Sequence, residues 1–163
     1  MPILEKIVKP QDAKHWSDSI PLEYHYTAGV AGEEFLRELK EKGRLVTSKC
    51  PKCKSSYIPT RMYCPSCFVE TKERRNIEPK GQVYSYAIVD RDRAGKKTSK
   101  PIVVALVKFE GVKGGLVHLL KVDSPKQVTI GMHVTAVLKR ESERTGSLSD
   151  IKSFRAIPGL GTQ

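Results

Sequence analysis

The pattern of hydrophobic and polar positions predicts an amphipathic helix near the start of the chain. Phe35, Leu36 and Leu39 recur at helical spacing and fall on one face. Acidic residues open this stretch, basic residues follow them, and Gly43 stands where a helix commonly ends. We therefore expect a helical N-terminal arm over residues 1–45.

The same arm carries large aromatic residues ahead of the helix, in a segment interrupted by proline and glycine. Such residues pack either against a partner or against the protein's own core, and the sequence is compatible with both interpretations. The candidate partner-binding residues are Trp16, Tyr24 and Tyr26.

Beyond residue 80 the hydrophobic pattern changes to that of β-strands. Five runs of strand length, rich in β-branched and aromatic residues, are separated by Gly, Pro, Asp, Ser or Lys clusters. These runs are residues 82–90, 101–109, 115–122, 132–140 and 150–157. A polar, charged stretch at residues 72–81 reads as a connector that leads into them.

The order of these patterns predicts a mainly β protein with N-terminal helices. Five short strands without an intervening long helix favour a five-stranded OB-fold barrel over residues 76–163. An SH3-like barrel or a small sandwich is the competing architecture. Residues 46–75, which lie between the arm and the barrel, hold all four cysteines.

The cysteines form two C-x2-C pairs, Cys50 with Cys53 and Cys64 with Cys67, separated by ten residues. Each C-x2-C turn can direct two thiolates at one point, so two turns complete a tetrahedron around Zn²⁺. This spacing predicts a closed, rubredoxin-like zinc ribbon. Iron accepts the same four-thiolate geometry, and two disulfides are a further alternative in an oxidising or hyperthermophilic interior.

Composition and charge limit the possible partners. The 163 residues include 29 Lys and Arg against 18 Asp and Glu, a formal net charge of +11, which favours acidic partners. The chain shows neither a secretory signal nor a run of 18 apolar residues, so we expect a cytoplasmic protein that does not enter the membrane. A single Asn and four Gln beside abundant Lys and Glu indicate a thermophilic source.

Residues that would carry catalysis are not apparent. The four histidines are scattered without metal spacing, and no P-loop, nucleophile elbow or dinucleotide-binding fingerprint occurs. Because the zinc site would use every cysteine, no reactive thiol is left over. We therefore do not expect an enzyme.

One segment concentrates positive charge in the connection between the first two barrel strands. Its five cations within ten residues are either a solvated loop or an anion clamp. Tyr84 and Tyr86, two residues apart on the preceding strand, are expected on one strand face, where either could stack on a base. The five cations are Arg91, Arg93, Lys96, Lys97 and Lys100.

Taken together, these parts resemble the zinc-ribbon OB-fold proteins long classed as a domain of unknown function, in their archaeal branch. The order of motifs carries the resemblance. These motifs are Lys-Gly-Arg-Leu at the end of the helix, the two C-x2-C turns (zinc knuckles), and the segments that begin at Tyr24, Gly81 and Thr129. The chain departs from this family's pattern at Lys54, where many members have glycine.

The resemblance implies a function that the residue patterns alone do not. Proteins of this family accompany thiolases and, in archaea, hydroxymethylglutaryl-CoA synthase as non-catalytic partners in acyl-CoA metabolism. This chain would then bridge acetoacetyl-CoA thiolase and the synthase at the start of the mevalonate pathway, and the cationic segment would bind CoA. A nucleic-acid-binding protein is the alternative, although only two aromatics align on one strand.

Overall fold

The computed structural model describes residues 9, 11, 22–23, 26–92 and 94–158. The predicted amphipathic helix is confirmed as α1 (Gly29–Lys42), which buries Phe35 and Leu39. It ends at Gly43, whose left-handed conformation (φ 62°) lets its amide donate to the carbonyl of Leu39 at 3.1 Å. Within the described residues, no helix is long and apolar enough to cross a membrane.

A four-stranded sheet follows the helix and holds the cysteine turns. Its strands are β1 (Leu45–Lys49), β2 (Ser56–Ile58), β3 (Glu73–Ile77) and β6 (Val112–Gly114), in the order β3-β1-β2-β6. The polar stretch at residues 72–81, predicted to be a connector, therefore contains a strand. It pairs antiparallel with β1 from Glu73 to Ile77, and its polar side chains are accommodated because β3 is an edge strand.

The five predicted barrel strands are also confirmed. They are β4 (Lys80–Arg91), β5 (Lys97–Lys108), β7 (Leu116–Lys121), β8 (His133–Leu138) and β9 (Ile151–Ala156). They close in the order β4-β5-β7-β9-β8, in which only the β7–β9 pair is parallel. Short 3-10 helices, η2 (Pro125–Gln127), η3 (Glu141–Glu143) and η4 (Leu148–Asp150), lie in the connections.

A shared hydrophobic cluster joins the helix, the ribbon sheet and the barrel. Phe35 and Leu39 of α1 belong to the same buried cluster as Ile58 of β2 and Val107 and Phe154 of the barrel. The cysteine turns form a separate small cluster around Tyr57. The barrel thus has an apolar core. The ribbon's tip, formed by the two cysteine turns, buries few apolar side chains and depends on another source of stability.

Polar contacts fasten the helix to the ribbon and to the barrel. Arg74 of β3 pairs with Glu34 of α1, with 2.6 Å between Nε and Oε2, and both side chains are partly shielded from water. On the other side, the guanidinium of Arg144 donates to the carbonyl of Lys40 at 3.3 Å. The orientation of the helix is therefore set by both parts of the fold.

Candidate metal centre and neighbouring surfaces

The two C-x2-C turns have the same backbone geometry. In the first, the amide of Cys50 donates to the carbonyl of Ser55 at 2.9 Å, and the amide of Lys54 donates back to the carbonyl of Cys50 at 3.0 Å. The second turn repeats both bonds around Cys64, at 2.9 Å each. In each turn the residue after the second cysteine is left-handed, with φ 59° at Lys54 and 57° at Phe68.

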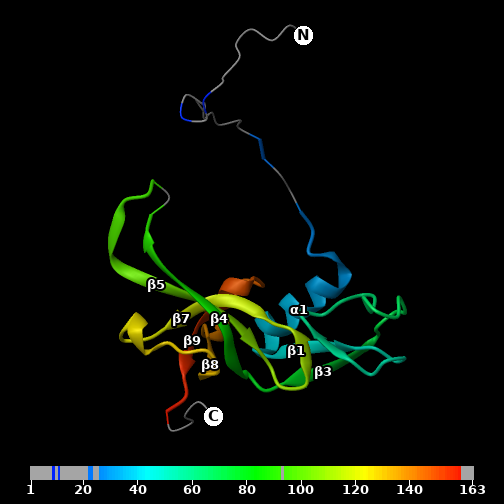
Figure 1. Ribbon diagram of the computed structural model, residues 1–163. Helices are drawn as coiled ribbons and strands as arrows, with labels where there is room; N and C mark the ends of the chain where they lie inside the picture. Colours follow the sequence, from blue (N-terminus) through cyan, green and yellow to red (C-terminus); the bar gives the residue numbers. More distant parts are fainter. Residues whose placement is uncertain (1–8, 10, 12–21, 24–25, 93, 159–163) are drawn as a thin grey trace, which may run out of the picture.

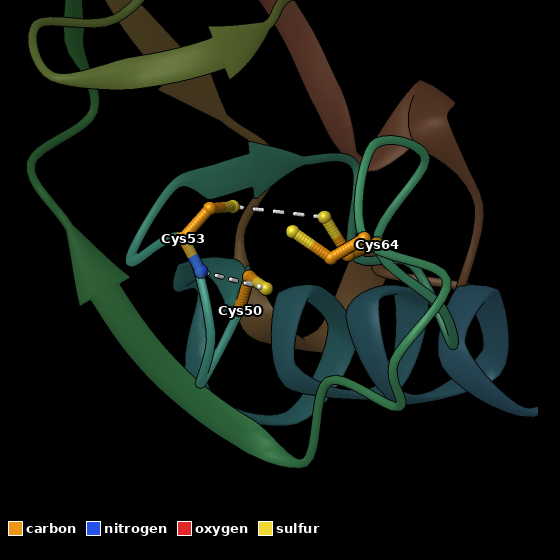
Figure 2. Close-up of side chains that lie close together, drawn as sticks. Cys50, Cys53 and Cys64 are labelled. Atoms are coloured by element: carbon orange, nitrogen blue, oxygen red, sulfur yellow. Dashed lines mark hydrogen bonds between the residues drawn. The ribbon is translucent and has the colours of Figure 1, made fainter.

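These matched turns bring the four thiol groups together. The Sγ atoms of Cys50, Cys53, Cys64 and Cys67 all lie within 4.8 Å of one another, and none forms a disulfide. Figure 2 shows Cys53 reaching toward Cys64, with 3.7 Å between their sulfurs. Tetrahedral zinc with bonds of about 2.3 Å holds its thiolates about 3.8 Å apart, so the cluster fits the ion.

The site is closed on one side and exposed on the other. Cys50 and Cys64 are buried, whereas Cys53 faces solvent. The Cys53 amide lies 3.4 Å from the sulfur of Cys50 (Figure 2), and the buried Tyr57 hydroxyl lies 3.4 Å from the sulfur of Cys64. Both donors would reduce the negative charge that four thiolates leave around a divalent ion.

The surroundings shift the pKa values of two of the thiols in opposite directions. Hydrogen bonds from the side chain and backbone of Ser55 lower the pKa of Cys53 to about 6. Burial raises the pKa of Cys67 to about 12. Since metal binding requires thiolates, zinc would displace a proton from Cys67 at neutral pH and protons would compete with zinc under acidic conditions.

The cationic segment is a hairpin tip rather than a loop. Strand pairing continues as far as Arg91 and Lys97, so β5 begins four residues earlier than the sequence pattern predicts. The Asp92 carboxylate accepts the amides of Ala94 and Lys96 at 2.9 Å each, and this cap makes the turn compact. Arg93 lies outside the described residues.

The prediction that Tyr84 and Tyr86 share a face is wrong, because β4 contains a bulge between Val83 and Ser85. Tyr86 pairs with Ala105, which points into the barrel. Tyr84 instead lies under Lys108, whose ammonium is 3.4 Å from the ring centroid. Only Tyr86 thus has a ring that Lys108 does not cover.

The aromatic residues of the N-terminal arm are only partly described. Trp16 and Tyr24 lie outside the described residues, whereas Tyr26 is 87% exposed. Two features of the ribbon are not predicted by the sequence pattern. The first is the Tyr57 hydroxyl beside Cys64, which the position of Tyr57 between the two C-x2-C turns could have indicated. The second is β6, whose three residues lack a strand-like pattern.

Comparison with known proteins agrees with this geometry. Residues 37–73 match the family model described as the ChsH2 rubredoxin-like zinc ribbon domain, and residues 75–139 match the ChsH2 C-terminal OB-fold domain. With the four-cysteine cluster, these matches assign zinc as the metal and OB-fold as the barrel type.

Similar sequences are named DUF35 domain-containing scaffold proteins. The one from Methanocaldococcus jannaschii is 34% identical over 109 residues, which is 66% of this chain and 76% of that protein. The one from Pyrococcus furiosus is 31% identical over 125 residues, or 76% of this chain and 90% of that protein.

Two solved structures share the fold. A DUF35 family protein of unknown function from Sulfolobus solfataricus superposes with a TM-score of 0.62 at 28% identity, covering 78% of this chain and 84% of that one. A chain of the Ltp2-ChsH2(DUF35) aldolase superposes with a TM-score of 0.55 at 28% identity, covering 76% and 93%.

Proposed function

This chain belongs to the DUF35 family of scaffold proteins, and on that premise we propose that it is a non-catalytic subunit of an acyl-CoA enzyme complex. It would bridge acetoacetyl-CoA thiolase and hydroxymethylglutaryl-CoA synthase and help to retain the CoA-bound intermediate. Formation of acetoacetyl-CoA is unfavourable, so close contact with the enzyme that consumes it would raise the flux into the mevalonate pathway.

The observation that best supports this proposal is the likeness to the Ltp2-ChsH2(DUF35) aldolase, whose name joins a DUF35 chain to an enzyme. The metal site points the same way, because four thiolates fill the coordination of zinc and leave no position for substrate. Zinc in such a site supplies folding stability for the ribbon rather than a Lewis acid for a reaction.

The hairpin tip is the proposed contact for the phosphates of CoA. Arginine can hold phosphate oxygens with two parallel hydrogen bonds, while lysine supplies a point charge. Tyr86, which is 39% exposed, would stack on the adenine, since Lys108 covers the ring of Tyr84. The cations proposed for this contact are Arg91, Arg93, Lys96, Lys97 and Lys100.

The scaffold proposal is tested by purifying the untagged protein from its own cells. We expect a thiolase and a synthase to co-purify with it, and the reconstituted assembly to convert acetyl-CoA with less free acetoacetyl-CoA than the separate enzymes release. Isolation of the chain alone, with no effect on either purified enzyme, would refute the bridging role. Tyr26, with Trp16 and Tyr24, is proposed to contact these partners, so substituting all three with Ala should weaken co-purification.

The CoA contact is tested separately, by calorimetry of CoA binding to the reconstituted complex. Replacing Arg91 and Arg93 together with Ala should weaken binding by about 2 to 4 kcal/mol if both contacts exclude water. Unchanged affinity would show that the tip is only a solvated turn. Replacing Lys113 and Lys126, two lysines outside the hairpin, with Ala provides the control for the loss of two positive charges.

Nucleic acid is the alternative ligand, favoured by the net charge of +11 and by the OB-type barrel. A phosphate backbone held by several cations would give binding whose logarithm falls with the logarithm of salt concentration by about 0.7 to 0.9 per contact. We expect only weak association with oligonucleotides. Tight binding near physiological salt would make this alternative the better description.

A further inference from the structure

The outer halves of β4 and β5 project from the barrel as a two-stranded arm (Figure 1). We define the arm as residues 84–92 and 94–102. In the described part of the chain, β4 pairs with β8 only at residues 80–82, and β5 pairs with β7 only from Val103 to Val107. Each strand of the arm therefore pairs only with the other and has one open edge.

Both faces of the arm carry exposed apolar side chains. Tyr86 and Ile88 continue the face of their cross-strand partners Ala105 and Val103, but Ile88 is 46% exposed because the barrel does not reach it. On the opposite face, Val89 pairs with Ile102, and these two are 39% and 50% exposed. A surface hairpin that stays exposed to water normally has one polar face. Neither face of the arm is polar in this way, because both expose apolar side chains.

The open edge of β4 is equally unusual. Exposed edge strands are normally protected by proline, by charge within the strand or by a covering element, because their free amide and carbonyl groups pair with other chains. From Tyr84 to Val89 the β4 strand contains neither charge nor proline, whereas the β5 edge carries Lys97, Lys100 and Pro101. The apolar faces and the unprotected β4 edge together indicate that another polypeptide covers the arm.

The charge at the end of the arm indicates the character of that polypeptide. Lys97 and Lys100 of β5 form no ion pair within the described residues, and Asp92 is occupied by the turn amides of Ala94 and Lys96. The arm's other acid, Asp90, is outnumbered by its cations, so the end of the arm is positive. A second copy of this chain would present the same cations and the same net positive charge, so repulsion opposes self-association through the arm. A surface rich in carboxylates complements it.

We propose that the arm inserts into a cleft of the partner enzyme that is apolar along its walls and carries Asp and Glu where the lysines end. This inference rests on the proposed scaffold function and adds the surface that makes the contact. In the assembled complex Lys97 and Lys100 would face these carboxylates, which leaves Arg91, Arg93 and Lys96 for the phosphates of CoA. Insertion buries both faces at once, which a flat docking surface would not do. The apolar walls hold the middle of the arm, and the carboxylates hold its end.

The test uses one substitution on each face, Ile88→Asp and Val89→Asp, in the full-length zinc-loaded protein. The matched control is Ile130→Asp, which places the same charge at a residue that is 65% exposed and lies outside the arm. Binding to the purified thiolase or synthase that co-purifies with the wild type is measured by calorimetry without CoA, so that phosphate cannot contribute. Equal zinc content and equal melting temperature establish that the variants are folded.

We expect each arm variant to weaken binding at least tenfold, the size of effect that a buried anchor residue produces, while the control stays within about twofold. Lys97→Glu combined with Lys100→Glu should also weaken binding, and added salt should weaken the wild type toward the same value. Hydrogen exchange should show that the amides of residues 84–89 that face the open edge of β4 exchange rapidly in the free protein and become protected in the complex.

Other outcomes separate this proposal from the scaffold role. If the wild type binds the enzyme and both arm variants bind equally well, the arm proposal is wrong and the scaffold role stands. Loss of binding in only one of the two variants would contradict insertion. Protection of amides 84–89 by concentration-dependent dimers of this chain would identify a second copy as the occupant. A wild type that binds neither enzyme would remove both proposals.

Discussion

Gly114 lies so close to Ile58 that a Cβ on Gly114 would be 2.2 Å from the Ile58 carbonyl oxygen. The two residues face each other in the parallel pair of β2 and β6, and the next amide, that of Gly115, donates to the same oxygen at 3.2 Å. This is the point where a strand that follows β5 of the barrel joins the ribbon sheet, so the contact ties the two β units together.

Gly114→Ala should therefore destabilise the protein by about 2 to 4 kcal/mol, because the new methyl group forces β2 and β6 apart. Gly111→Ala is the control, since Gly111 also has positive φ but has open space around its Cβ position. That variant should lose only the backbone term of about 1 kcal/mol. Urea unfolding of both variants measures the difference, and equal losses would show that the close approach is unimportant.

Cys64→Ser should remove zinc and loosen the ribbon while the barrel stays folded, because the ribbon's tip has few buried apolar residues whereas the barrel has its own core. Metal analysis should find about one zinc per wild-type chain and almost none in the variant. Hydrogen exchange should increase in residues 50–70 and remain slow in β7 and β9. Lys52→Ser, in the exposed middle of the first turn, should retain the metal.

Tyr57→Phe should weaken zinc binding about 10-fold to 100-fold, because it removes a buried hydroxyl that lies 3.4 Å from the Cys64 sulfur. Competition with a coloured chelator at fixed pH measures the change. Tyr63→Phe removes a hydroxyl from a tyrosine that is 55% exposed and should leave the affinity unchanged. An equal effect of the two substitutions would mean that the Tyr57 hydroxyl does not stabilise the thiolate.

Lys54→Gly should stabilise the first knuckle by about 0.5 to 1 kcal/mol, because Lys54 has φ 59° and a side chain is disfavoured in that conformation. The gain should be visible as a higher melting temperature of the zinc-loaded protein. Lys52→Gly, at a position without positive φ, should be neutral or destabilising. A loss of stability in Lys54→Gly would show that the lysine side chain contributes more than its backbone conformation costs.

Asp150→Asn should destabilise the protein by about 2 kcal/mol at pH 7 and by progressively less as the pH falls below about 4. Burial alone raises the pKa of Asp150, but amides of Thr145, Gly146 and Ser147 and the Thr145 hydroxyl together lower it below its usual value. A lowered pKa in the folded state stabilises the protein above the unfolded pKa, near 4, and this contribution disappears as the pH falls through the folded value.

Urea unfolding of this variant at several pH values measures the dependence. Asp123→Asn, in the turn after β7, controls for the loss of a charge and should have only a small effect on stability. The difference in unfolding free energy between Asp150→Asn and the wild type should shrink at low pH. If it is as large at pH 3 as at pH 7, the three amides do not act by stabilising the carboxylate charge.

The features that depend on local pattern were predictable from the amino-acid sequence. The spacing of the cysteines predicted the four thiol ligands, because a C-x2-C turn places its two sulfurs together whatever surrounds it. Phe35 and Leu39 predicted the buried face of α1, and Gly43 its end, because helical periodicity and the left-handed cap are properties of neighbouring residues. The barrel strands were recognisable because each carries a β-rich run bounded by turn residues.

The features that depend on pairing between distant segments could not be predicted from the sequence, because they require the folded chain. Asn76 and its neighbours became a strand because β1 lies beside them, and Gly114 became a strand residue because Ile58 accepts its close approach. A bulge at Tyr84 turned Tyr86 to the other face. The arm's exposure likewise follows from where β7 and β8 stop pairing with β5 and β4, because burial depends on which strands lie alongside and not on the residues of the arm itself.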